Sequence, residues 1–101
     1  MRVMLHAHID TEAGNEAIRN GTLPQMMSKV TEQLKPEAAY FFPSMGRRSC
    51  MFFFDMQDSS QLPPVAETFF MELGAEVEIL PVMNADDLKK GLQTLESRGN
   101  A

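Results

Sequence analysis

Apolar and polar residues alternate with two different periods along the chain, and each period predicts its own kind of element. Alternation from one residue to the next predicts strands over residues 3–9, 38–44, 49–56 and 76–83. Apolar residues three and four positions apart predict helices over residues 22–34, 62–73 and 84–95. The segment 10–21 is polar, and we expect it to hold one or two helical turns around residues 15–19.

Residues that favour helix ends stand at the borders of these segments. Thr22 and Gln25 have the spacing of a capping box. Pro36 ends the first helix, because the residue before a proline is pushed out of the helical region. Gly74 suits the end of the second helix, and Asn84 suits the N-cap of the third. The predicted order is β-α-β-β-α-β followed by a C-terminal helix.

This order predicts an α+β fold of the ferredoxin-like type. Two β-α-β halves form one antiparallel sheet, with helices on one face and the first and third strands in the middle. Pro81 lacks a backbone donor, which fits a fourth strand at the edge. The whole chain, 1–101, is expected to be a single domain whose last residues, 96–101, are frayed.

The third strand departs from the pattern of a sheet that has one face in water. Cys50, Phe52 and Phe54 lie on one face of this strand, while Met51 and Phe53 lie on the other. Since both faces are apolar, the face without the two helices needs a second cover. The C-terminal helix is one candidate for that cover, and a second copy of the sheet is the other.

The order and length of these elements resemble the dimeric α+β barrel superfamily over the whole chain. The resemblance rests on residues 3–9, 51–55 and 76–83, and residues 10–15, 35–41 and 81–88 are most similar to its short, uncharacterised bacterial members. It implies a homodimer in which two sheets face each other and enclose a cavity. The superfamily includes isomerases, cofactor-free monooxygenases, polyketide cyclases and haem-handling enzymes, so the resemblance implies no single reaction.

Composition and charge narrow the classes of partner. The chain has 101 residues, 44% of them apolar, and a formal net charge of −5. Nine basic residues against 14 acidic ones, without a basic block, argue against nucleic acid. We also expect neither a membrane span nor a signal peptide, since no apolar stretch has the required length. The single cysteine, Cys50, favours a reducing, cytoplasmic compartment.

Two histidines are the first candidates for chemistry. His6 and His8 are two residues apart on a predicted strand, so their side chains share one face. If the intervening apolar residues pack under the helices, one imidazole can act as a general base and the other as a hydrogen-bond donor. Glu78 and Asp55 are the nearest additional metal ligands, but the spacing fixes no third ligand, and we expect no metal. The alternative places both histidines at a wet sheet edge or a dimer seam.

Further residues complete the candidate site. Tyr40, the only tyrosine, can hold a substrate oxygen, or its hydroxyl can lie at the rim of an interface. Met4, Met51 and Phe53 would make the cavity apolar. Glu78 either faces that cavity or belongs to an ordinary half-exposed edge strand.

Other reactive residues are expected to be structural. Asp55 can be a base with a raised pKa, but a turn cap is the simpler interpretation. Cys50 is expected to be a small buried side chain rather than a nucleophile. Arg47 and Arg48 are expected at a solvated hairpin tip, or paired with an acidic partner surface.

The sequence therefore predicts a small homodimer that binds a small apolar or aromatic metabolite in a cavity between two sheet faces. Catalysis remains an open alternative at this point, in the form of a cofactor-free isomerase, cyclase or monooxygenase-type enzyme. The rival is a non-catalytic binding or interaction protein whose lumen is filled by side chains. A haem-handling protein is a weaker alternative, since a histidine ligand is available but nothing else favours haem.

Overall fold

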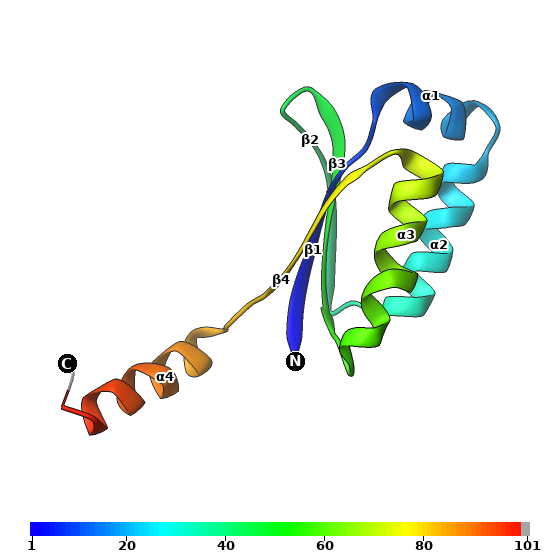
Figure 1. Cartoon of the computed structure of the whole chain (residues 1–101). Helices are drawn as coiled ribbons and strands as arrows, with labels where there is room; N and C mark the ends of the chain where they lie inside the picture. Colours follow the sequence, from blue (N-terminus) through cyan, green and yellow to red (C-terminus); the bar gives the residue numbers. More distant parts are fainter. Residues whose placement is uncertain (100–101) are drawn as a thin grey trace.

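One antiparallel sheet organises the chain in the computed structural model, which describes residues 1–99 (Figure 1). Its strands are β1 (Arg2–His8), β2 (Ala38–Ser44), β3 (Arg47–Asp55) and β4 (Glu76–Pro81). Their order across the sheet is β2-β3-β1-β4, so β1 and β3 are central and β2 and β4 form the edges. The protein is therefore a small α+β domain, and its arrangement is compatible with a ferredoxin-like fold.

The helices α2 (Thr22–Leu34) and α3 (Leu62–Leu73) lie side by side against one face of the sheet (Figure 1). A short 3-10 turn, Ser59–Gln61, precedes α3 and is capped by Asp58. The predicted capping box at the start of α2 is wrong, because Thr22 is already helical and the N-cap is Gly21, which has no side chain to accept a bond. Gly21 has a φ of 76°, a left-handed conformation that glycine adopts readily.

The polar segment after β1 forms a complete helix, α1 (Thr11–Arg19), longer than the one or two turns expected. The side chain of Asp10 accepts a hydrogen bond from the backbone nitrogen of Ala13 at 2.9 Å and so caps the first turn. Ala17 and Gly14 are its buried residues. Because its two buried residues are small, the segment has only a weak helical period of apolar residues. The sequence pattern therefore predicts a shorter helix than the one observed.

Between the sheet and the helices lies the core. Alternate residues of β1 are buried on this side, together with Phe52 of β3 and Phe69 of α3. The rings of Phe52 and Phe69 meet edge to face at 6.4 Å between centroids. Because every second residue of β1 enters the core, the residues between them, His6 included, face the other way.

A tight two-residue turn, Met45–Gly46, joins β2 to β3. Both residues have positive φ, 54° and 75°, as the hairpin turn that follows the sheet twist requires. The turn is shorter than the four residues expected, and Arg47 and Arg48 belong to β3. β4 ends at Pro81, two residues before the predicted end of that strand.

The last helix, α4 (Ala85–Ser97), projects away from the rest of the molecule (Figure 1). The predicted cap is confirmed, since Asn84 and Asp87 form a reciprocal capping box. No residue of α4 is buried, and Leu88, Leu92 and Leu95 are 44–50% exposed. The C-terminal helix was one candidate cover for the second sheet face, and in this structure it does not cover that face. The helix continues past residue 96, and residues 100–101 of the expected frayed end lie outside the described part.

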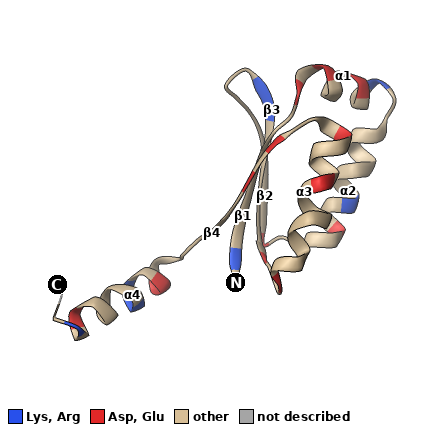
Figure 2. Ribbon diagram, in the orientation of Figure 1, with Lys and Arg blue, Asp and Glu red and all other residues tan. Residues whose placement is uncertain are grey.

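Charged residues are sparse in the middle of the sheet (Figure 2). Arg2, Arg47, Arg48 and Asp55 lie at strand ends, and Glu76 and Glu78 lie on the edge strand β4. Within residues 1–99, no helix is long and apolar enough to cross a membrane.

Candidate functional site

The face of the sheet opposite α2 and α3 is here called the open face. Pairing of the strands aligns its side chains in three rows, each running from β2 through β3 and β1 to β4. The rows are Tyr40–Met51–His6–Glu78, Phe42–Ser49–His8–Glu76 and Ala38–Phe53–Met4–Leu80. All seven residues assigned to the site from the sequence, namely Met4, His6, His8, Tyr40, Met51, Phe53 and Glu78, belong to this face.

The two histidines lie in contact at the centre of the open face. Their ring centroids are 4.6 Å apart, with the ring planes tilted by 55°. Phe42 stacks on His6 from the other side of β3, at 5.9 Å between centroids. Each imidazole is therefore held by aromatic packing within a largely apolar surface, which limits its rotation.

Ser49 determines which nitrogen of His8 is free. His8 Nδ1 lies 2.8 Å from Ser49 Oγ, and Ser49 Oγ donates to the carbonyl oxygen of Arg47 at 3.2 Å. We assign the hydroxyl proton to that carbonyl, so that Oγ accepts the Nδ1 proton of His8. This assignment of the hydrogen-bond network leaves the lone pair of the neutral ring on Nε2, the nitrogen that can accept a proton from a ligand.

His6 has a different environment. Its Nδ1 lies 3.8 Å from Glu78 Oε1 on β4. Its Nε2 is buried and has no hydrogen-bond partner among residues 1–99. A buried polar nitrogen without a partner costs about 1–3 kcal/mol, so a group that bonds to Nε2 would stabilise the site.

Tyr40 is not brought to the histidine pair within one chain. Tyr40 and His6 share a row, but Met51 of β3 stands between them. The tyrosine side chain is on an edge strand and 61% exposed. A role for its hydroxyl beside the histidines therefore requires a second molecule.

The expected apolar lining is present around the histidines. Met4, Met51 and Phe53 are all half-buried on the two central strands. Phe53 is paired directly with Met4, and Met51 with His6. These bulky side chains form a mostly apolar surface. Between the charged strand ends, His6, His8 and Ser49 are the polar groups that the central strands place on it.

Asp55 does not suit the part of a base. Its carboxylate binds the amino group of Met1 at 2.7 Å, and this hydrogen bond and charge lower the pKa of Asp55. The hypothesis of a raised pKa is therefore wrong. Asp55 is also not the cap of the next turn, because Asp58 fills that position.

The other reactive residues have structural partners. Burial raises the pKa of the Cys50 thiol to about 11, which agrees with a buried, inert cysteine. Arg47 pairs with Glu76 at 3.0 Å and lowers the pKa of that carboxyl group. Arg48 donates to Asn15 Oδ1 at 2.9 Å. Both arginines thus have partners within the chain, rather than standing free at a hairpin tip.

The candidate metal ligands named from the sequence, His6, His8, Glu78 and Asp55, do not come together as a metal centre. Over the described residues 1–99, no three His, Cys, Asp or Glu side chains gather closely enough to hold an ion. In the register between β1 and β3, Asp55 lies opposite Arg2, at the other end of β1 from His8.

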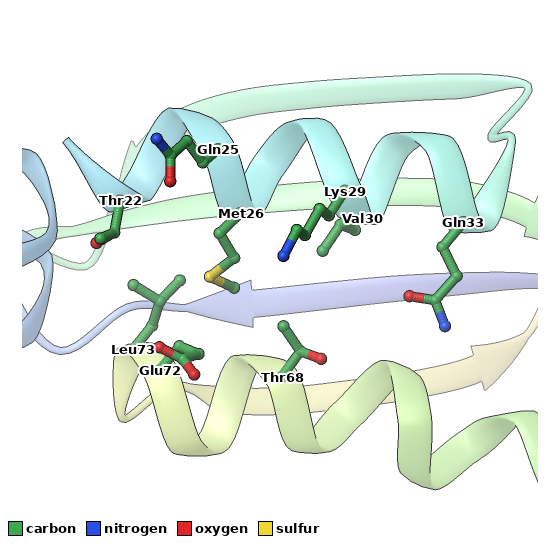
Figure 3. Close-up of a pocket in the computed structure, with 9 residues that line it drawn as sticks. All are labelled: Thr22, Gln25, Met26, Lys29, Val30, Gln33, Thr68, Glu72 and Leu73. Atoms are coloured by element: carbon green, nitrogen blue, oxygen red, sulfur yellow. The ribbon is translucent and has the colours of Figure 1, made fainter.

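A separate hollow of about 400 Å³ lies between α2 and α3, on the helix side of the sheet (Figure 3). Met26, Val30 and Leu73 form its apolar floor, and Lys29 and Glu72 reach toward it from the two helices (Figure 3). It is remote from the histidines, because the sheet separates the two. Its polar rim contains no buried reactive group, so the open face remains the candidate site.

Two residues of the site were not assigned from the sequence. Ser49 was counted only as the polar start of an apolar strand, and Phe42 only as a strand residue. The signal for Ser49 was its position opposite His8 in an antiparallel pair, which becomes visible once the register is known. Phe42 contacts His6 diagonally across β3, and no spacing in the sequence predicts that contact.

Of the comparisons with known proteins, one crystal structure supports the α+β fold. No protein-family model matches the chain, and no curated protein matches it. A crystal structure of a formyltetrahydrofolate deformylase from Pseudomonas putida KT2440 is similar with a TM-score of 0.50 and 11% identity. The likeness covers 98% of this chain and 38% of that enzyme, so the chain spans well under half of its length. The de novo designed protein Ferredog-Diesel gives a TM-score of 0.49 at 7% identity, over 80% of this chain and 85% of the design. At these identities the likeness concerns the fold alone.

Proposed function

We propose that the protein is a ferredoxin-like homodimer whose two open faces meet and bind a small apolar or aromatic molecule between them. The observation that supports this most strongly is the pair of histidines in contact on a mostly apolar sheet face. A half-buried Met and Phe surface on the central strands favours a partner over water. The buried, unpaired thiol of Cys50 fits a reducing, cytoplasmic setting.

The chemistry that fits this face is proton transfer without a cofactor. In the proposed step, His8 Nε2 accepts a proton from a carbon next to a ligand carbonyl. The C–H electron pair is then delocalised onto the carbonyl oxygen. The proton on His8 exchanges with solvent, and a solvent-derived proton is returned from His8 to that carbon or to a conjugated one. A donor must hold the oxygen on which charge develops. His6 Nε2, when it bears a proton, and Tyr40 are the donors that the face offers.

The test is deuterium exchange from D₂O into cyclic and aryl ketones, followed by proton NMR with cyclohexanone and acetophenone as first probes. Exchange should exceed that of the buffer and fall by about 10²-fold or more in His8→Gln, as expected for loss of a general base. His6→Gln should weaken ketone binding while leaving His8 Nε2 intact. Unchanged exchange in His8→Gln would remove His8 from the mechanism.

The second candidate function is a non-catalytic dimer whose interface is filled by side chains. It is favoured by the size of Met4, Met51 and Phe53, which stand at the centre of each face. In that case neither ketone would exchange and neither would shift the NMR signals of the histidines. The dimer would remain, and its role would be an interaction rather than a reaction.

A further inference from the structure

A further pocket, here called the edge pocket, lies on the helix side of the sheet between the edge strand β2 and α2. Phe41 of β2 is 60% exposed there, although its ring meets Phe52 edge to face at 5.8 Å between centroids. The volume of the edge pocket is about 350 Å³, which is within the range of small-molecule sites. Its apolar wall is formed by Ile9, Leu23, Met27, Phe41 and Pro43.

One charged side chain, that of Arg48, borders the edge pocket. Arg48 is half-buried and lies on the same face of β3 as Cys50, two residues away. Its guanidinium is held by α1, where it donates to Asn15 Oδ1 at 2.9 Å and to the carbonyl oxygen of Thr11 at 3.4 Å. Gly14 leaves room for this group, since a Cβ at that position would lie 2.9 Å from Arg48 Nη1. The cation is therefore held in place beside the apolar wall.

The charge of Arg48 has no counterpart in the described part of the chain. Both of its acceptors are neutral oxygens, and no carboxylate of residues 1–99 lies within ion-pair distance of it. Arg2, Arg19 and Arg47, by contrast, each pair with a carboxylate. A guanidinium has five N–H donors, so Arg48 can still donate to another acceptor. A carboxylate suits it best, because the two planar groups can form parallel hydrogen bonds.

We infer that the edge pocket binds a small aromatic carboxylic acid in its ionised form, with the carboxylate on Arg48 and the ring against the apolar wall. Phe41 and Met27 favour an aromatic body, because aromatic rings and thioethers both pack well on an aromatic surface. The inference does not rest on the proposed dimer or on the histidines. Phe42 and Ser49 of the open face also border the edge pocket, but its apolar wall and its cation belong to the helix side.

The first test compares two ligands on the unmodified chain, at a pH at which the acid is ionised. The probes are 2-naphthoate and 2-naphthamide, which share a ring system and differ in charge. Isothermal titration calorimetry should show saturable binding of 2-naphthoate, about 10-fold or more tighter than that of 2-naphthamide, because hydrogen bonds to a charged group are the stronger ones. No saturable binding, or equal affinity for the two compounds, would overturn the inference.

Methyl NMR signals locate the ligand in the same samples. We expect 2-naphthoate to shift the methyl signals of Leu23 and Met27, which belong to the edge pocket, and to leave those of Met4 and Met51 in place. Shifts centred on Met4 and Met51 would assign the ligand to the open face and would contradict the inference. They would leave the proposed function standing, so the two proposals are separable.

Two neighbouring arginines of β3 supply a matched pair of variants. Arg48→Gln should weaken 2-naphthoate binding by about 10-fold or more and remove the preference over 2-naphthamide. Arg47→Gln removes an equal charge on the other face of β3 and should leave both affinities unchanged. Equal losses in the two variants would show an effect of net charge alone and would refute the assigned role of Arg48. If Arg48→Gln does not fold, the comparison of the two ligands on the unmodified chain still decides the inference.

Discussion

Replacing Ser49 with alanine tests the state of the proposed base without touching either histidine. In the folded protein, Ser49 Oγ lies 2.8 Å from His8 Nδ1, and in the tautomer assigned above it is the acceptor. A hydrogen bond of this kind contributes about 1 kcal/mol net. Its loss should change the ratio of the two neutral tautomers of His8 by about fivefold, in favour of the proton on Nε2. Deuterium exchange should slow by at most that factor, because the reactive nitrogen is less often free.

The assay is a long-range proton–nitrogen NMR spectrum of the imidazole rings, recorded above the range in which histidine titrates. The Nδ1 and Nε2 signals of His8 should move toward each other or exchange positions in Ser49→Ala, while those of His6 move little. Ser49→Thr keeps a hydroxyl and should restore the original pattern. Ser28→Ala, at an exposed serine of α2, is the matched control. Unchanged His8 signals in Ser49→Ala would refute the assigned tautomer and, with it, the role of Nε2.

Three further predictions concern the scaffold. The Cys50 thiol, with its pKa raised to about 11, should stay protonated and resist iodoacetamide at pH 8.5, and rapid alkylation of folded protein would show that the strand opens. Phe52→Ala should lower the free energy of unfolding in urea by about 3–5 kcal/mol, since Phe52 is fully buried, and a loss below about 1 kcal/mol would contradict the described core. Amide hydrogens of α4 should exchange far faster than those of β1, because a 13-residue helix without buried residues is marginal in water. Protection of α4 as strong as that of β1 would reveal that its leucines pack against another molecule.

The sequence predicted the sheet and the faces of its strands, because period-two alternation is a local signal. The shared face of His6 and His8 follows from that alternation. The central position of β1 and β3 follows from the order of the elements and the ferredoxin-like plan that it predicts. The individual side-chain contacts of the site could not be predicted from this alternation. The bond from His8 to Ser49 depends on the register between β1 and β3, and the stacking of Phe42 on His6 depends on side-chain conformations across β3.

The errors at helix starts and in the assignment of Asp55 have physical causes as well. Thr22 was expected to be a cap, but Gly21 at the preceding position adopts the left-handed conformation and is the N-cap, so the helix begins at Thr22, one residue earlier than expected. Asp55 was weighed as a base because three phenylalanines precede it. Its environment is set instead by the amino group of Met1, which is 54 residues away in sequence and adjacent only in the fold. A local sequence pattern cannot predict an electrostatic partner that is distant in sequence.

The account's central claim is that two copies of the open face form one reactive site. The most direct measurement is the rate of ketone deuterium exchange per chain as a function of protein concentration, with the dimer fraction measured in the same samples by sedimentation. The account predicts that the rate per chain rises in proportion to the dimer fraction and reaches a plateau when the dimer is complete. A rate per chain that stays constant down to concentrations at which the protein is monomeric would contradict a shared site, and exchange no faster than in buffer at any concentration would contradict the proposed chemistry.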